Sequence, residues 1–408
     1  MTESAPSTLA GDAPVLDLFA PDFAPDSAET LAAQEKSWYA ATSVGVAVLR
    51  YEQAQKLLRD PRLWQSTTVF HAMQGVTAGP FVDWWADTLL GAEGDHHARL
   101  HRLVAPAFRP ARMEAMRSMA RRAIEGLVER VADRGEVDVV AELTDLYPTL
   151  VLSELLQVPE SVGAQARGWT ATFTLGFGLQ VAEHIDAVND AAVNLGALMD
   201  ELIAHRRAHP VEGLVSDLIS AEAEGDRLSH PELRAMLMGL LFSGHDTVRN
   251  QLASGLLLFA QHPDQWELLA RRPELASLAV EEILRLIPCV PVISRTPRED
   301  MEFEGVPLPV GSFVAVLIPT AHRDPLVYGP DAGFRVDVPR PATLAFGAGI
   351  HSCLGVSLAR VELHEALLAL TRRFEAPVPA GPVQWRAPGG IFGPNRLPVV
   401  LTPRPAAG

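Results

Sequence analysis

The sequence predicts a mainly α-helical fold, with a single large domain and a small β-sheet portion. Apolar residues recur at helical spacing through most of residues 98–286, most clearly over 143–156 and 189–207. Proline and glycine residues separate these segments, and short β-like runs begin only after Pro288. The 408 residues, 48% of them hydrophobic, contain no repeat, low-complexity linker or break near the midpoint. Such a chain can bury one large core.

Each element follows from a local pattern. Residues 1–27 are rich in Pro, Ala and Asp and are expected to form a flexible arm before the folded domain, residues 28–408. Alternating hydrophobicity predicts strands and the 3.6-residue period predicts helices. Outside the long helical region the expected elements are a strand at 44–49, a helix at 51–59, strands at 290–294, 301–303 and 313–318, and a helix at 354–374 before a turn-rich tail.

The composition indicates a cytoplasmic protein without nucleic-acid or membrane partners. The net charge of −16 disfavours binding to nucleic acid. Two cysteines, Cys289 and Cys353, are too few for a disulfide framework, so a reducing compartment is expected. The longest apolar runs, such as 252–260, are too short to cross a bilayer, and the N-terminus lacks the pattern of a signal peptide. We expect the chain to be a monomer.

The most informative segment is residues 346–360, FGAGIHSCLGVSLAR. Three glycines surround Cys353, and a helical pattern begins directly after it, so its thiolate would be stabilised at a helix N-terminus. One thiolate cannot build a zinc site or an iron–sulfur cluster, but it can be the axial ligand of a haem. Cys289 has no such surroundings and is interpreted as a small buried apolar residue.

This loop resembles the cysteine-ligand loop of the cytochrome P-450 family, FGxGxHxCxGxxLAR, at every defining position. The resemblance extends over about residues 30–402 and implies the family's helical domain, with haem b (iron protoporphyrin IX) buried between helices. It implies that Cys353 is the axial ligand of the haem iron and that His351 contacts a haem propionate. Phe346 would pack beside the sulfur and tune its electron donation.

Two further segments resemble the family's propionate-binding positions. In residues 95–108, His97 matches a propionate-binding histidine, whereas His101 stands four residues on, where the family has an arginine. Arg295, ten residues after Arg285, matches a third propionate ligand. The resemblance therefore implies that His97, His101 and Arg295 bind the cofactor, with His101 in place of the usual guanidinium or with the contact shifted.

Glu282 and Arg285 lie three residues apart on a predicted helix, so their side chains can pair. They resemble the family's ExxR motif, a structural ion pair behind the haem. In the family a further arginine completes this network, but Val338 stands at its position here. The nearest candidates are Arg335 and Arg340, and Arg340 is the better one if the connection to the cysteine loop is two residues shorter.

Residues 242–252, FSGHDTVRNQL, form a predicted helix interrupted by small residues. Gly244 predicts a local opening of the helical hydrogen bonds, whereas the alternative is an ordinary helix in which Thr247 bonds its own backbone carbonyls. The segment resembles the family's oxygen-activating motif, (A/G)Gx(D/E)T, with Ser243 replacing a small apolar residue. The resemblance implies that Thr247 bonds dioxygen or a water and that Asp246 relays protons.

Together these resemblances imply a monooxygenase that inserts one atom of dioxygen into a partly or wholly apolar organic substrate. We expect hydroxylation or epoxidation in natural-product biosynthesis or catabolism, on a substrate that is free or bound to a carrier protein. The chain has no flavin or nicotinamide motif, so a separate ferredoxin and ferredoxin reductase are the expected electron donors. The alternatives are a peroxide-driven peroxygenase, which the Asp246–Thr247 pair disfavours, and a non-catalytic haem-thiolate binding module.

The substrate pocket is placed by resemblance and is rich in apolar and aromatic residues. Its segments are residues 64–90, which are expected to form a loop, and residues 172–181, 240–247, 290–293 and 391–392. The candidate pocket residues are Ser243, Gly244, Val290, Val292, Ile391 and Phe392. Trp84 and Trp85 fit the pocket and the core equally well.

Residues 96–122 form a basic segment in an otherwise acidic chain. They carry seven arginines against one acidic residue, Glu114, for a net charge of +6. The resemblance places this segment near the cysteine, on the face where an acidic redox partner would dock. A solvated helix face without a partner is the alternative.

Overall fold

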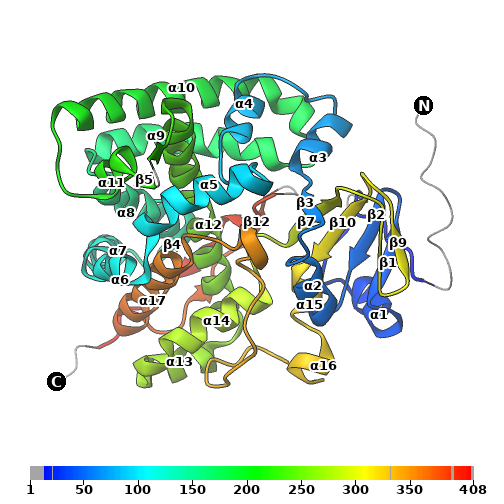
Figure 1. Cartoon of the computed structure of the whole chain (residues 1–408). Coiled ribbons are helices and arrows are strands. Elements are labelled where there is room, and N and C mark those ends of the chain that lie inside the picture. The colour runs from blue at the N-terminus through cyan, green and yellow to red at the C-terminus, as the bar shows by residue number, and fades with distance from the viewer. Residues whose placement is uncertain (1–12, 21, 224, 331, 387–389, 406–408) are drawn as a thin grey trace.

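The computed structural model describes residues 13–20, 22–223, 225–330, 332–386 and 390–405. A large helical body lies on the left of Figure 1, with α10 along its top, and a smaller sheet region lies on the right. The predicted mainly helical fold with a small sheet portion is confirmed. Within the described residues, no helix combines the length and hydrophobicity that are needed to cross a membrane.

The helices of the body surround α12 (His230–Gln261), which packs against helices from both sides. The others are α4 (Pro80–Ala86), α5 (Gly94–Val104), α6 (Pro110–Ala115), α7 (Arg117–Val131), α8 (Tyr147–Leu156), α9 (Glu160–Phe173), α10 (Val181–Ala208), α11 (Leu214–Ser220), α13 (Pro263–Arg271), α14 (Ala276–Leu286) and α17 (Val356–Arg373). Helices α1 (Ala28–Lys36), α2 (Tyr51–Leu57), α3 (Thr67–Met73), α15 (Ile318–Ala321) and α16 (Pro325–Tyr328) lie in or near the sheet region (Figure 1). Single turns are η2 (Ala105–Phe108), η3 (Val140–Thr144), η4 (Thr174–Phe177), η5 (Pro273–Leu275) and η6 (Gly349–His351).

The main sheet has five strands in the order β1-β2-β10-β7-β3. Its strands are β1 (Tyr39–Thr42), β2 (Gly45–Val48), β3 (Leu63–Gln65), β7 (Val292–Pro297) and β10 (Phe313–Leu317). Strands β2 and β10 pair in parallel, and the other neighbouring strands of this sheet pair antiparallel. The strands expected at 44–49 and 313–318 are confirmed, and the one expected at 290–294 begins two residues later as β7.

The other strands form small separate ladders. They are β4 (Glu136–Asp138), β5 (Glu222–Ala223), β6 (Asp226–Arg227), β8 (Met301–Phe303), β9 (Val306–Leu308), β11 (Val378–Pro379), β12 (Gln384–Trp385), β13 (Pro394–Arg396) and β14 (Pro398–Val400). Strand β14 lies between β11 and β4, which ties the C-terminal tail to the helical body. Strands β12 and β13 form a hairpin near α12.

The described part of the expected N-terminal arm is held against the sheet. The N–H of Leu16 donates to Ala41 O at 2.9 Å, the N–H of Ala41 donates to Pro14 O at 2.8 Å, and Leu16 is only 3% exposed. The expectation of a flexible arm therefore fails for residues 14–16, because backbone pairing and burial of an apolar side chain outweigh the loose composition. Residues 1–12 of the expected arm lie outside the described residues.

Residues 64–90 do not form the expected loop, since they contain α3 and α4. Trp84 and Trp85 are 4% and 7% exposed and belong to the core. Trp84 donates its indole N–H to Ala235 O at 3.1 Å and packs against Phe173 with ring centroids 4.7 Å apart. The aromatic side chains in this segment therefore stabilise the packing of α4 on α9 and α12.

Helix α12 belongs to two hydrophobic core clusters. Its N-terminal half packs with α4, α8, α9 and α10, and its C-terminal half packs with α7, α13, α14 and α17. Ser229 and Glu232 form a capping box that fixes its start. Two glycines permit close packing, because a Cβ at Gly244 would lie 2.9 Å from Leu152 of α8 and a Cβ at Gly255 would lie 2.9 Å from Ile283 of α14.

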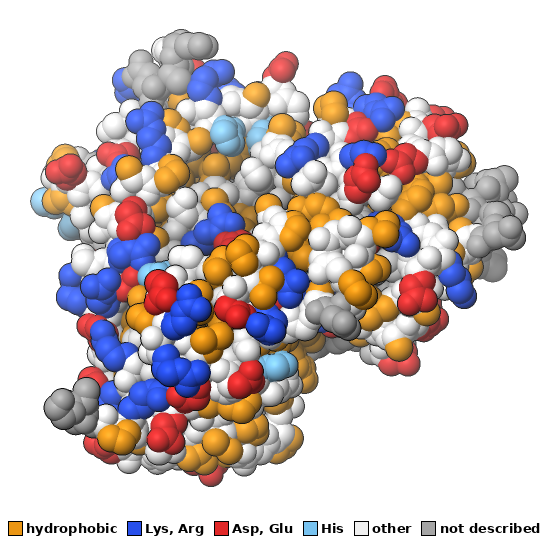
Figure 2. Space-filling model, turned by 90° about the horizontal axis from the view of Figure 1, so that it is seen from below, with side chains coloured by type: hydrophobic (Ala, Val, Ile, Leu, Met, Phe, Trp, Pro, Cys, Tyr) orange, Lys and Arg blue, Asp and Glu red, His pale blue; other side chains and the backbone are white. Residues whose placement is uncertain are grey.

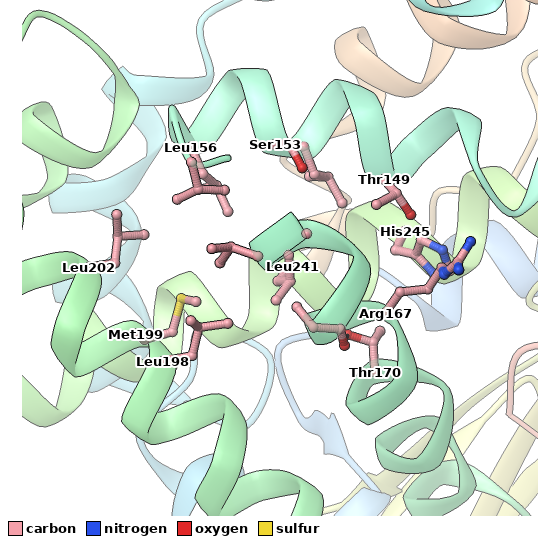
Figure 3. Close-up of a pocket in the computed structure, with 15 residues that line it drawn as sticks. Thr149, Ser153, Leu156, Arg167, Thr170, Leu198, Met199, Leu202, Leu241 and His245 are labelled. Carbon is pink, nitrogen blue, oxygen red and sulfur yellow. Dashed lines mark hydrogen bonds between the residues drawn. The ribbon is translucent and has the colours of Figure 1, made fainter. Parts of the chain in front are cut away.

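A small cavity of about 20 Å³ lies between α8, α9, α10 and α12. Figure 3 shows leucine and methionine side chains pointing toward one another around it, with His245 and Arg167 at one end. Its volume is that of about one water molecule. The cavity is a packing defect at the junction of four helices rather than a substrate-sized pocket.

Glu362 of α17 is a buried carboxyl whose protonation state should affect stability. It is 2% exposed, its Oε2 has no hydrogen-bond partner among the described residues, and burial raises its pKa well above the ordinary value. The folded chain therefore holds this proton, and stability is lost as pH rises above the unfolded-state pKa of about 4.3.

We therefore expect the free energy of unfolding of Glu362→Gln to exceed that of the wild type by a margin that grows with pH. The margin should grow by up to about 1.4 kcal/mol per pH unit, because only the wild type must keep this carboxyl protonated to stay folded. The two free energies of unfolding should be closest near pH 4. Urea unfolding of both proteins between pH 4 and pH 8 measures this difference. A difference that is independent of pH would show that Glu362 is ionised in the folded protein.

Candidate active site

The cysteine loop between the sheet region and α17 has a conformation that requires glycine. Gly347 and Gly349 have φ values of 70° and 76°, and a Cβ at Gly349 would lie 2.6 Å from Leu58 O. The N–H of Cys353 donates to Phe346 O at 3.0 Å and closes the loop. The glycines identified in the sequence therefore allow the loop to approach the end of α2.

The sulfur of Cys353 lies at the start of α17. Its residue is exposed to solvent, but the protein that surrounds the sulfur raises the pKa of the thiol, while the N–H groups of Gly355 and Val356 and the charge of Arg360 act to lower it. Two backbone amides directed at one sulfur are the donors that a metal-bound thiolate requires. The donor set therefore fits a thiolate ligand to a haem iron. The ring of Phe346 lies 5.1 Å from the guanidinium carbon of Arg360.

The three histidines that are expected to contact the propionates, His97, His101 and His351, lie side by side. The ring centroids of His97 and His351 are 4.7 Å apart, and those of His97 and His101 are 5.8 Å apart. His97 is 4% exposed, its Nε2 has no partner among the described residues, and burial with the nearby His351 and His101 lowers its pKa to about 4. An unsatisfied buried ring nitrogen fits an additional polar ligand.

Arg295 of β7 supplies a buried cation. It is 2% exposed, and its Nη1 donates to Gln65 Oε1 and to Ser294 O, both at 2.9 Å. Burial lowers its pKa to about 10, so it stays positively charged at neutral pH. The charge of Glu93 acts to raise this pKa. A buried guanidinium with little local compensation is suited to bind a carboxylate.

Glu93 is a residue of this cluster that the sequence analysis missed. Its carboxylate lies 3.0 and 3.1 Å from His351 Nε2 and accepts the N–H of Gln65 at 2.6 Å. It stands at the N-terminal end of α5, four residues before His97. His351 follows 258 residues later in the chain, so no local motif connects the two.

The Glu282–Arg285 ion pair lies at the centre of a buried network. Arg285 Nε and Nη2 donate to the two oxygens of Glu282 at 2.7 and 2.8 Å, and both side chains are 1% exposed. Arg285 also donates to the backbone oxygens of His322 at 3.1 Å and Ala332 at 2.7 Å. The geometry confirms the predicted pairing and shows that Arg285 satisfies carbonyls of two other segments.

Arg340 is the side chain that joins this network. Its Nε lies 3.7 Å from Glu282 Oε2, and it is 14% exposed. Arg335 contributes only its backbone N–H, which donates to Glu282 Oε1 at 3.0 Å, while its side chain pairs with Asp337 at the surface. The interpretation that favoured Arg340 over Arg335 is confirmed.

His322 extends the network toward the cysteine loop, and the sequence analysis missed it. It is fully buried, its Nδ1 lies 3.0 Å from Arg285 O, and its Nε2 accepts the N–H of Leu344 at 2.7 Å. Burial lowers its pKa to about 3, so the ring is neutral and can donate from Nδ1 while it accepts at Nε2. His322 therefore ties α14 to the segment that enters the loop two residues before Phe346.

The predicted opening of α12 at Gly244 is wrong, because the helix runs without a break from His230 to Gln261. Thr247 Oγ1 donates to Ser243 O and Ser243 Oγ donates to Gly239 O, both at 2.6 Å. The alternative of an ordinary helix with a back-bonded Thr247 is the observed one. A Cβ at position 244 would point toward α8, so close packing against α8 accounts for the glycine at this position.

Asp246 is buried on α12 and is fully engaged by donors. It is 1% exposed, and Arg386 Nη1 and Nη2 donate to its oxygens at 2.6 and 2.8 Å. Thr174 Oγ1 and Asn250 Nδ2 donate at 3.2 and 3.4 Å. The sequence analysis missed Arg386, which lies 140 residues away in the chain.

Two of the expected pocket segments meet beside α12. The N–H of Phe392 donates to Cys289 O at 2.7 Å, and the N–H of Cys289 donates to Gln251 Oε1 at 2.9 Å. Phe392 stacks on Trp385 with ring centroids 5.1 Å apart. Ile391 is 7% exposed, whereas Val290 and Val292 are half-buried, the latter at the first position of β7.

Arg340 and Arg335 provide a matched test of the Glu282 network. Arg340→Gln removes a mostly buried cation from Glu282 and should cost roughly 1–3 kcal/mol of stability. Arg335→Gln leaves the backbone N–H in place and should have no measurable effect. Urea unfolding of both variants measures the difference. Equal losses would contradict the assignment of Arg340 to the network.

Comparisons with known proteins show which family the chain resembles. A family model described as Cytochrome P450 matches residues 265–390. The chain is 38% identical over 394 residues to luteothin monooxygenase of Streptomyces thioluteus, which covers 95% of this chain and 96% of that protein. It is 30% identical over 372 residues to polyketide biosynthesis cytochrome P450 PksS of Bacillus subtilis, with coverages of 89% and 91%.

Solved structures show the same fold. The cytochrome P450 enzyme CxnD for C–S bond formation in chuangxinmycin biosynthesis superposes with a TM-score of 0.85 at 27% identity, over 96% of this chain and 99% of that one. P450BioI in complex with an acyl carrier protein superposes with a TM-score of 0.82 at 26% identity, over 90% and 96%. The cofactor is therefore haem, and the reaction class is oxygen-incorporating oxidation. The chain belongs to the cytochrome P450 family.

Proposed function

We propose that this P450 inserts one oxygen atom from dioxygen into a small, largely apolar molecule of natural-product metabolism, with electrons from a separate ferredoxin and its reductase. The observation that carries the proposal is the placement of Cys353 and Asp246 near one interior thiol. The charges of both residues act on Cys289, whose pKa burial raises to about 12. The cysteine loop and the acidic position of α12 therefore border the same region of the interior.

The residues of the chain have separate tasks in this reaction. Haem ligated by a thiolate supplies the activation of dioxygen when it is bound. Cys353 would hold the metal, with the amides of Gly355 and Val356 directed at its sulfur, and His97, His101 and Arg295 would bind the propionates. Here His351 has Glu93 as its partner, so any propionate contact would be shared with that carboxylate.

Thr247 and Asp246 of α12 are the residues that transfer protons in this proposal. The hydroxyl hydrogen of Thr247 is donated to Ser243 O, which leaves its oxygen lone pairs free to accept a hydrogen bond from water. Asp246 is the buried carboxylate next to it and is the group that can receive a proton from solvent and pass it inward.

The substrate class is supported by the lining residues and by the relatives. Ile391, Val290 and the stacked pair Trp385 and Phe392 give an apolar and aromatic surface near Cys289. The relatives include a mycinamicin IV hydroxylase/epoxidase at 36% identity and a nocardicin C N-oxygenase at 34% identity. Their names describe oxygen insertion into carbon and nitrogen of natural products, and we propose the same general chemistry for this chain.

A redox partner would dock on the side formed by α6, α14 and α17. A hollow of about 440 Å³ lies there, and Arg117, Arg360 and His364 are among the residues that line it. Figure 2 shows arginines gathered on the left of one face, with acidic side chains between them. Ion pairs among the described residues engage several arginines of residues 96–122: Arg99, Arg112, Arg117, Arg121 and Arg122. The excess positive charge of this segment is therefore smaller than its sequence indicates.

Arg109 is the best single probe of this docking surface. It is exposed, and no ion pair to it is present among the described residues. Arg109→Glu should slow reduction by ferredoxin several-fold and weaken its dependence on salt, because surface charges steer association. Arg207→Glu on exposed α10 is the matched control. Stopped-flow reduction across a salt series measures both variants, and equal rates would contradict docking at Arg109.

The thiolate ligand is tested by the spectrum of the ferrous–carbon monoxide complex. The wild type and Cys289→Ser should show the red-shifted Soret band of a haem-thiolate protein, whereas Cys353→Ser should lose it. Cys289 is the matched control because it is the second cysteine and also lies near Asp246. Loss of the band in Cys289→Ser alone would contradict the assignment of Cys353.

A further inference from the structure

Glu93 places a carboxylate among the residues to which the proposed function assigns the haem propionates. It is the N-cap residue of α5, but its side chain forms no capping hydrogen bond to that helix. The carboxylate lies 3.0 and 3.1 Å from Nε2 of His351 and accepts the N–H of Gln65 at 2.6 Å. Its side chain is 11% exposed, and that of His351 is 4% exposed. The local helix therefore does not explain this acid, whereas its tertiary contacts do.

Gln65 of β3 connects this carboxylate to the buried cation Arg295. Its backbone N–H binds Glu93, and its side-chain Oε1 accepts from Nη1 of Arg295 at 2.9 Å, so a glutamine bridges the two charges. Burial lowers the pKa of Arg295 and that of His97, and the charge of Glu93 opposes both shifts. The acid is therefore close enough to act electrostatically on both groups.

The permanent charges of this propionate cluster, which consists of Glu93, His97, His101, Arg295 and His351, cancel one another. Arg295 supplies one positive charge, and Glu93 supplies one negative charge. Position 101, where the resemblance to the family predicts an arginine, holds a histidine without a permanent charge. Two carboxylates of a cofactor would therefore meet one permanent cation and one like charge, and a like charge disfavours them.

Glu93 also uses the hydrogen-bond donor of His351. A carboxylate only accepts hydrogen bonds, so Nε2 of His351 carries the hydrogen and donates it to Glu93. A propionate that binds at Nε2 has to compete with an acceptor that the fold holds in place, at a high effective concentration. Charge and hydrogen bonding therefore both oppose tight binding of a propionate at His351.

We propose that Glu93 is a positioning residue that weakens the binding of the haem propionates and lowers the reduction potential of the iron. It acts through His351, whose donor it occupies, and through its charge near Arg295. One electron from the ferredoxin converts ferric to ferrous iron and adds one negative charge to the site, which a nearby carboxylate disfavours. The inference rests on the proposed function, in which the propionates bind at this cluster.

The rate of haem loss tests the effect on propionate binding. Haem transfer from the ferric holoprotein to excess apomyoglobin is measured for the wild type, Glu93→Gln and Asp95→Asn. Glu93→Gln keeps an oxygen that can accept the N–H of Gln65 but removes the charge. It should lose haem roughly fivefold more slowly than the wild type, a factor that corresponds to about 1 kcal/mol. Asp95→Asn is the matched control and should not change the rate, because Asp95 is an exposed acid in the first turn of the same helix.

The sign of this effect separates the proposal from a purely structural role of Glu93. An acid that only holds His351 and β3 in place would release haem faster when it is replaced. A rate of haem loss in Glu93→Gln that equals or exceeds the wild-type rate therefore overturns the inference.

Reduction potentials provide a readout that packing alone would not move. In a spectroelectrochemical titration, the midpoint of Glu93→Gln should lie at a more positive potential than the midpoints of the wild type and Asp95→Asn. His101→Arg adds a cation to the cluster and leaves Glu93 in place, so it should also shift the midpoint to a more positive potential. An unchanged midpoint in either cluster variant would overturn the inference, because the charges of the cluster would then not act on the iron.

Two further measurements report the proposed function separately. Arg295→Gln should lose haem faster than the wild type if the propionates bind at this cluster, and an unchanged rate would contradict that placement. The ferrous–carbon monoxide band reports ligation by Cys353. Faster haem loss in Arg295→Gln and a normal band, together with unchanged haem loss in Glu93→Gln, would reject this inference alone.

Discussion

The buried ion pair of Glu282 and Arg285 is the interaction on which the cysteine loop depends. Two charges that are 1% exposed are tolerated because they bind each other and also hydrogen-bond to backbone groups of neighbouring segments. Arg285 binds carbonyls of the segments before and after α16, and its own carbonyl binds His322. His322 in turn accepts the N–H of Leu344 at the entry to the loop. Removing one member would therefore leave unpaired groups in three segments and free the loop that presents Cys353.

The second constraint on the fold is helix α12, which contributes residues to both hydrophobic core clusters. Its glycines at 244 and 255 let α8 and α14 pack closely against it, and the helix is unbroken and largely buried. Asp246 and Thr247, to which we assign the transfer of protons, are thus carried on an element that is packed from both sides. The hairpin of β12 and β13 is held against this helix by the Arg386–Asp246 pair, by the hydrogen bond from Arg249 Nη1 to Pro394 O and by two close glycine contacts, and Phe392 N–H binds Cys289 O beside it.

The site combines groups that would be costly to bury without partners. Asp246 and Arg386 pair with each other, whereas His97 retains a buried nitrogen without a partner among the described residues, and Arg295 is only weakly compensated. Such groups are suited to a further polar ligand, and we propose that the carboxylates of the cofactor take this place. Glu93 lies beside His351 and adds a negative charge to this cluster. The net charge of the cluster is therefore lower than that of the histidines and Arg295 alone.

The sequence by itself determined the features that depend on neighbours along the chain. The cysteine loop, the start of α17, the Glu282–Arg285 pair and strands β2, β8 and β10 follow from local period, glycine positions and spacing. Tertiary structure decided which distant groups meet, since a side chain's partner is set by packing in space. The tertiary contacts include Arg386 on Asp246, Glu93 on His351 and the paired arginines of residues 96–122, and the unbroken course of α12 past Gly244 arises in the same way. No local pattern encodes a contact across 140 or 258 residues, so these pairings could be identified only from the folded chain.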